Sequence, residues 1–152
     1  MNHSKSGLFL MELIICILFF ALSAALCVQM FAHSHTVSKK NIDENNAILL
    51  CNNLAECFYA EFGELSKISD KFYPNNSKVE NNAFTAYYNE SFEPVVVSDS
   101  MDNFEGYILE LSEPPASDTG IRKGDISFFK TDSSGITNIF NINLQVNQPN
   151  HI

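Results

Sequence analysis

Tryptophan is absent from the sequence and basic residues are scarce: nine Lys and Arg stand against 18 Asp and Glu, which gives a formal net charge of −9. A surplus of acidic side chains repels the phosphates of nucleic acids, so no nucleic-acid partner is expected. Helix-breaking residues are also rare in the first half of the chain. No proline occurs between Leu8 and Lys71, and Gly63 is the only glycine in that stretch. This part of the chain can therefore form long helices.

Motifs that carry catalysis are missing as well. The sequence contains no glycine-rich phosphate loop, no Gly-x-Ser-x-Gly and no His-Glu-x-x-His, so we expect neither an enzyme nor a cofactor. His33 and His35 are two positions apart and face different sides of a helix. The acidic residues Asp99, Asp102 and Glu105 match no ligand spacing for calcium. No metal site is predicted.

The four cysteines do not form a disulfide framework. Cys16 and Cys27 lie in an apolar run and are interpreted as small packing residues. Cys51 and Cys57 lie on a predicted helix six positions apart, so they are separated by about 9 Å along the axis and cannot be bridged. No spacing of cysteine and histidine indicates zinc.

The dominant feature that is present is the apolar run from Leu8 to Ala32, in which Glu12 is the only charged residue. About 25 residues at ~1.5 Å each give roughly 37 Å of helix, enough to cross a hydrocarbon core of about 30 Å with some tilt. A backbone in lipid must satisfy its own hydrogen bonds, so the run is predicted to be a transmembrane helix.

A short polar leader precedes this run and ends in Gly7; residues 5–12 read KSGLFLME. The run starts directly after the glycine, and its single carboxylate follows five residues past it. This arrangement resembles the class III signal of type IV pilins and type II secretion pseudopilins. The likeness is close over roughly the first quarter of the chain and holds only in outline for the rest.

The resemblance implies a processing and assembly pathway. A prepilin peptidase would cut between Gly7 and Leu8 and methylate the new amine of Leu8. Glu12 would attract the amine of a neighbouring subunit and set the axial register during assembly. The implied partners are this peptidase, other pilin or pseudopilin subunits, an inner-membrane assembly platform and membrane lipid. The implied location is the cytoplasmic membrane, with a single pass and a cytoplasmic N-terminus, and then a cell-surface filament.

Two details depart from the family pattern. Leu8 follows the glycine where phenylalanine is commonest, and the membrane segment lacks the bending Pro or Gly found in many pilins. The missing bend favours a minor subunit or pseudopilin over a bulk subunit. The lysines do not settle topology by themselves, because Lys5 precedes the run while Lys39 and Lys40 follow it; the cytoplasmic N-terminus rests on the resemblance.

Other interpretations of the N-terminus remain open. A cleaved secretory signal would use Lys5 as its charged region and the small residues Ser23, Ala24 and Ala25 as its cleavage site, although Glu12 argues against it. A lipoprotein signal ending at Cys27 is disfavoured because Leu26 precedes it. An ordinary signal anchor would carry Glu12 by accident.

Beyond Ala32, a polar patch leads into a predicted amphipathic helix, and an antiparallel sheet is expected to cover its apolar side. The predicted apolar stripe steps by three or four positions and comprises Ile48, Cys51, Ala55, Phe58, Phe62 and Leu65. Strands are predicted at 83–89, 93–98, 104–111, 125–131 and 135–146, with a loop at 113–123, a hairpin turn at 132–135 and a frayed tail at 148–152.

The sequence thus predicts an α+β fold in which a long N-terminal helix packs on a small antiparallel sheet, as in pilins. The expected parts are a leader (1–7), a transmembrane helix (8–32), an extracytoplasmic amphipathic helix (33–72) and a β part (73–152). The expected function is a prepilin-like subunit, in a minor role, of a type IV pilus or a type II secretion or competence pseudopilus. The alternatives are an anchored extracytoplasmic binding domain that does not polymerise and a secreted α+β domain that loses its signal.

Overall fold

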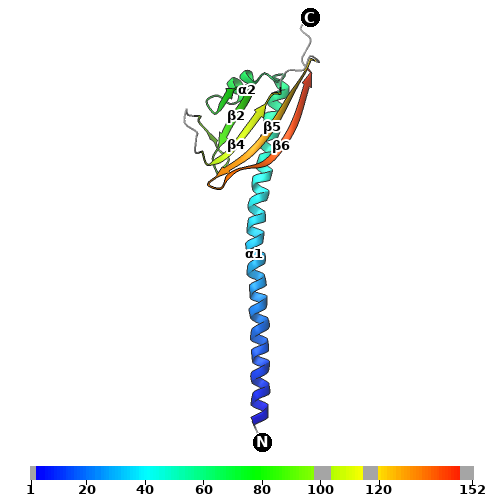
Figure 1. The fold of residues 1–152 in the computed structure, drawn as a ribbon, viewed down its shortest axis with the longest axis vertical. Helices are drawn as coiled ribbons and strands as arrows, with labels where there is room; N and C mark the ends of the chain where they lie inside the picture. Colours follow the sequence, from blue (N-terminus) through cyan, green and yellow to red (C-terminus); the bar gives the residue numbers. More distant parts are fainter. Residues whose placement is uncertain (1–2, 98–103, 115–119, 148–152) are drawn as a thin grey trace. The chain divides into compact units, whose positions relative to one another are not determined.

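The computed structural model describes residues 3–97, 104–114 and 120–147 and divides into two compact units, Met1–Ile42 and Asp43–Ile152. Helix α1, from His3 to Ala60, runs through the first unit and into the second. The second unit also holds a short helix, α2 (Leu65–Phe72), and one sheet. Figure 1 shows the sheet beside the C-terminal part of α1. The predicted α+β layout of a long N-terminal helix on a small antiparallel sheet is confirmed.

Helix α1 ends in a Schellman-type turn rather than continuing to residue 72 as predicted. The Gly63 amide donates to the Phe58 carbonyl at 2.9 Å, and the Phe62 amide donates to the Tyr59 carbonyl at 3.4 Å. Phe62 and Gly63 both have positive φ, at 51° and 80°, a conformation that reverses the chain direction and satisfies the last carbonyls of the helix. The predicted helix is therefore two helices, α1 and α2.

The sheet has six antiparallel strands in the order β1-β2-β4-β5-β6, with β3 paired to β2. The strands are β1 (Ser77–Glu80), β2 (Ala83–Tyr88), β3 (Pro94–Val95), β4 (Gly106–Ser112), β5 (Ile121–Asp132) and β6 (Gly135–Asn147). Four of the predicted strands are present with shifted ends, and the predicted strand at 93–98 is reduced to the two residues of β3. Strand β1 was not predicted, and β5 begins at Ile121, inside the predicted loop. The residues Asp99 and Asp102 and the predicted tail lie outside the described residues.

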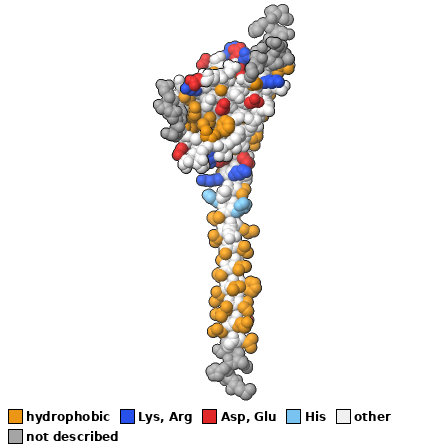
Figure 2. Space-filling view, in the orientation of Figure 1, with side chains coloured by type: hydrophobic (Ala, Val, Ile, Leu, Met, Phe, Trp, Pro, Cys, Tyr) orange, Lys and Arg blue, Asp and Glu red, His pale blue; other side chains and the backbone are white. Residues whose placement is uncertain are grey.

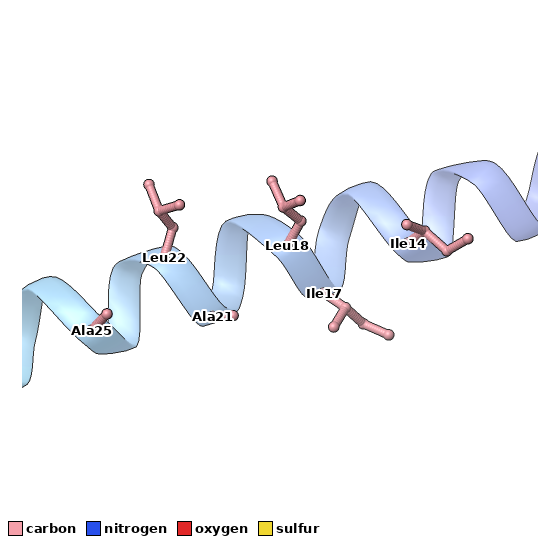
Figure 3. A pocket seen from close by; sticks show the side chains of 6 residues that line it. All are labelled: Ile14, Ile17, Leu18, Ala21, Leu22 and Ala25. Atoms are coloured by element: carbon pink, nitrogen blue, oxygen red, sulfur yellow. The ribbon is translucent and has the colours of Figure 1, made fainter.

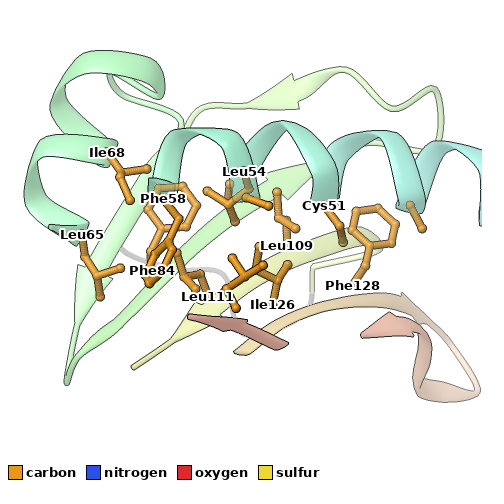
Figure 4. Packing of buried hydrophobic residues seen from close by; sticks show 14 of the residues in the cluster. Cys51, Leu54, Phe58, Leu65, Ile68, Phe84, Leu109, Leu111, Ile126 and Phe128 are labelled. Atoms are coloured by element: carbon orange, nitrogen blue, oxygen red, sulfur yellow. The ribbon is translucent and has the colours of Figure 1, made fainter. Parts of the chain in front are cut away.

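One face of the sheet packs against α1 (Figure 4). Strands β2, β4 and β5 contribute alternating buried residues, because successive side chains of a strand point to opposite faces; these are Phe84, Ala86, Tyr88, Tyr107, Leu109, Leu111, Ile126 and Phe128. From α1 the buried side chains are Ala47, Cys51, Leu54, Ala55 and Phe58, and α2 adds Leu65 and Ile68.

The predicted apolar stripe is confirmed at four positions and wrong at two. Cys51, Ala55, Phe58 and Leu65 are buried, but Ile48 is 40% exposed and Phe62 is 46% exposed. Phe62 leaves the stripe because it lies in the turn after α1, where the helical repeat has already ended. Truncating Phe62 is therefore not expected to open the core, contrary to what the periodicity of the sequence suggests.

Candidate functional site

Gly7 lies inside α1, at a place where the fold does not require glycine. It has helical geometry without a positive φ, and a Cβ atom built on it meets no described atom within 4 Å. Glycine in a helix interior costs about 1 kcal/mol relative to alanine, so helix formation disfavours it. Neither packing nor backbone conformation in the described residues accounts for Gly7, and a role as a processing signal is compatible with this.

Glu12 lies one helical turn beyond Leu8. A separation of four residues places the two on the same side of the helix, about 6 Å apart along its axis. Both residues are exposed, and no hydrogen bond or ion pair joins Glu12 to another described residue. The only charged side chain of the apolar run therefore faces outward, next to the peptide bond that the leader pattern marks.

The apolar run is exposed on every side of α1. Its large apolar side chains have exposed fractions from 46% at Ile15 to 79% at Phe31. Figure 2 shows apolar side chains along the visible side of this part of the helix. Apolar surface of this extent is not stable in water, and α1 is long and apolar enough to cross a membrane.

Small residues open a shallow apolar groove along this surface (Figure 3). Ala21 and Ala25 lie one turn apart at its floor, and larger aliphatic side chains flank them; the lining residues are Ile14, Ile17, Leu18, Ala21, Leu22 and Ala25. Small residues four positions apart let a second helix approach closely in lipid, where packing rather than water exclusion drives association. The groove is thus suited to receive a large side chain from a neighbouring helix.

Ser23 and the polar residues that follow the run are compatible with a membrane. The Ser23 hydroxyl donates to the Phe19 carbonyl at 2.9 Å, so it is satisfied within the helix. The exposed residues His33, His35, Lys39 and Lys40 follow the run directly. Figure 2 shows this change from apolar to basic side chains along α1. Histidine and lysine at the end of an apolar helix suit the level of the lipid headgroups.

The second unit carries a polar cluster that local sequence patterns did not reveal. Asp43 accepts a hydrogen bond from the Tyr107 hydroxyl at 2.8 Å and an ion-paired hydrogen bond from the Lys130 ammonium at 2.9 Å. The hydrogen bond that Lys130 donates to Asp43 raises the pKa of Lys130, and burial raises the pKa of Tyr107. This cluster joins α1 to strands β4 and β5. Nothing in its geometry resembles an activated nucleophile, so it is a structural contact.

Two cysteines and two tyrosines form a second group of residues with shifted pKa values. Burial raises the pKa of Cys51 to about 12 and that of Tyr88 to about 12, and it also raises the pKa values of Cys57 and Tyr73. All four cysteines of the chain are free thiols, and a buried neutral thiol is inert. Within residues 3–97, 104–114 and 120–147, no three His, Cys, Asp or Glu side chains are grouped so as to hold a metal ion.

Comparison with known proteins adds no further constraint: no family model, no curated protein and no solved structure matches this chain.

Proposed function

We propose that this protein is a prepilin-like subunit that is cut after Gly7, methylated on Leu8 and assembled through α1 into a filament of the type IV pilus or type II secretion or competence class. The proposed role is that of a minor subunit or pseudopilin. Its work is mechanical, since apolar helices pack in the filament core while the sheet unit faces outward. The proposed partners are a prepilin peptidase, other subunits of the same class, an inner-membrane assembly platform and membrane lipid.

The observation that carries this proposal is the position of Glu12. A carboxylate exposed on a membrane helix costs on the order of a few kcal/mol, so it requires a partner or a role. Within the described chain it has no partner. Cutting the bond between Gly7 and Leu8 creates an amine one helical turn away, on the same side of the helix. A neighbouring subunit displaced along the axis by that amount brings its amine to Glu12, where the low dielectric strengthens the pair.

The groove at Ala21 and Ala25 supports close packing of such helices. Ala21 and Ala25 leave room for a side chain from a neighbouring subunit, while the exposed aliphatic residues around them supply contact area. A helix that only anchors a domain needs neither the unpaired carboxylate nor the groove. The rival function is such an anchor, which holds an extracytoplasmic binding domain without polymerising.

Processing is the first test. Coexpression with a prepilin peptidase should shorten the chain by seven residues and add one methyl group, as measured by intact mass. Replacing Gly7 by a bulky residue (Gly7→Val) should block cleavage, whereas Ser23→Val in the same helix should leave it unchanged. A mature N-terminus near Ala24 or His33 would instead reveal an ordinary signal peptidase.

Assembly is the second test, and it separates a filament subunit from an anchor. Glu12→Leu removes a costly charge from the membrane segment and should insert as well as the parent. We expect the variant to be cut and membrane-resident but depleted from sheared filaments. Gln29→Leu, which removes a polar residue elsewhere in the same helix, is the matched control and should assemble normally. Equal recovery of Glu12→Leu and parent chains in filaments would contradict the proposal.

A further inference from the structure

The two edge strands of the sheet differ in length, charge and proline content, which are features that decide whether an edge can pair with another chain. On one edge, β1 has only four residues, two of which are the ion-paired Lys78 and Glu80, and the two-residue β3 begins with Pro94. Short strands, charged side chains and proline are the features that keep an edge from pairing with another chain. That edge is protected.

Strand β6 forms the other edge and lacks each of these protections. It is 13 residues long, and its sequence, GITNIFNINLQVN, contains no charged residue and no proline. It pairs with β5 from Gly135 to Asn147 except at Ile139, where a bulge opposite Phe128 and Phe129 shifts the register, and no other described strand is paired with it. Residues 140–147 are therefore the regular part of this edge. The second side of its backbone ladder therefore carries N–H and C=O groups that only another extended chain can match one for one.

The side chains of β6 point to the same conclusion. From Phe140 to Asn147 apolar residues alternate strictly with amides. The apolar members Phe140, Ile142 and Val146 pack against the core while remaining partly exposed. A strand added beside β6 would extend this apolar layer by one row if its own side chains alternated in the same way.

We propose that the β6 edge binds an extended segment of a partner polypeptide, which adds to the sheet as an antiparallel strand. The segment is uncharged and alternates apolar with polar residues. The rival occupant is a second copy of this chain. Its antiparallel pairing through β6 needs a two-fold axis normal to the sheet, which sets the two α1 segments packed on the sheets in opposite directions, and the oligomeric state of the chain in micelles tests it below.

Amide hydrogen exchange of the full chain in detergent micelles tests the proposal directly. The probe is a synthetic peptide with the sequence of residues 140–147 and two lysines at each end for solubility, because in-phase antiparallel pairing places its apolar residues opposite those of β6. Saturating peptide should slow exchange in segment 135–147 by roughly tenfold or more while leaving segment 77–80 unchanged. A scrambled peptide without the alternation should have no effect.

Two modified peptides distinguish strand pairing from apolar adhesion. One carries N-methyl groups on its odd-numbered residues and the other on its even-numbered residues, so only one of them keeps the amides that face β6. We expect one peptide to slow exchange and the other to fail. Equal effects of both, no effect of any peptide, or equal slowing at segment 77–80 would overturn the proposal.

Protein variants complete the experiment. Ile142→Lys places a charge on the face where the added strand contributes apolar side chains, and it should abolish the effect of the peptide. Asn143→Lys places the same charge on the opposite face and should retain it. A chain that is already dimeric through segment 135–147 in micelles would contradict the choice of partner. Because these readouts involve neither Gly7 nor Glu12, their failure is distinct from a failure of the processing or assembly tests.

Discussion

Two segments of helix α1 differ in how their side chains are exposed. Between Leu8 and Phe31, no side chain of α1 is buried. Between Asp43 and Ala60, the same helix has a single buried side, and Leu49 and Tyr59 on other sides are 57% and 46% exposed. The backbone geometry is the same throughout. The distribution of apolar residues around the helix, rather than helix propensity, separates a segment that could cross a membrane from one that packs on a sheet.

The largest expected loss of stability comes from removing a buried side chain of α1. Phe58 is fully buried between α1 and the sheet, so Phe58→Ala should lower the free energy of unfolding by about 3–5 kcal/mol. Phe31→Ala, on the apolar run, removes a ring that is 79% exposed and should leave the stability of the sheet unit within about 0.5 kcal/mol of the parent. Denaturant unfolding of the full chain in micelles, followed by the near-ultraviolet dichroism of its tyrosines, compares the two. Similar losses would remove the distinction between the two segments.

Gly124 and Gly7 extend the comparison between the packed unit and the exposed part of α1. A Cβ atom on Gly124 would lie 2.9 Å from Leu111 Cδ1 and 3.0 Å from Phe58 Cε2. Gly124→Val should therefore destabilise the sheet unit by about 1–3 kcal/mol, although valine is the better strand former. Gly7→Val, with no described atom within 4 Å of its Cβ, should leave the unit unchanged.

The contact with Phe58 can be isolated by a second substitution. If the ring is what opposes the new side chain, the double variant Gly124→Val with Phe58→Leu should cost less than the sum of the two single changes. Strictly additive losses in the same unfolding measurement would assign the effect of Gly124→Val to something other than this contact.

Alkaline pH should weaken the sheet unit. Burial raises the pKa of Cys51 from 9.0 to about 12, and it raises the pKa of Tyr88 from 10.0 to about 12. A raised pKa in the folded state means that the unfolded chain loses its proton first. The stabilisation is therefore complete below about pH 9 and is lost progressively as the pH rises toward the folded pKa values.

The slope of stability against pH measures this effect. Each group contributes up to about 1.4 kcal/mol per pH unit between its unfolded and folded pKa values. Cys51→Ala should lower stability at neutral pH but flatten the decline above about pH 9, because one titrating group is gone. An unchanged slope in this variant would show that Cys51 does not ionise on unfolding.

Sequence patterns located most of the elements because burial imposes its period on the residues. The alternation in β2 and β4 and the apolar run of α1 were read correctly for that reason. Strand β1 escaped prediction because it is a short edge strand with Lys78 and Glu80, so no alternation is visible. The end of α1 was missed although Gly63 marked it, because Phe62 and Leu65 continued the apparent repeat past the turn.

The residues described under the candidate site also divide into those that the sequence predicts and those that only the structure reveals. Gly7, Leu8 and Glu12 form a local pattern and could be found from the sequence, and the structure adds that Gly7 has no packing role among the described residues. Asp43 has its partners 64 and 87 positions away, at Tyr107 and Lys130. No local spacing encodes such contacts, so they become visible only when the strands are assembled.

The smallest expected effect concerns the first residue of the packed segment of α1. Asp43 binds both Tyr107 and Lys130, and the side chains of Asp43 and Lys130 are 19% and 38% exposed. Solvent screens a pair of this kind, so Asp43→Asn should cost only about 1 kcal/mol. Asp70→Asn, at an exposed position of α2, is the matched control and should have no measurable effect. In a double-mutant cycle with Lys130→Met, we expect a coupling of about 0.5–1 kcal/mol that shrinks in high salt. A coupling of zero would mean that Asp43 adds no stability to the packing of α1 on the sheet. The stabilising contacts would then begin one turn later, at Ala47, the first fully buried residue of the helix.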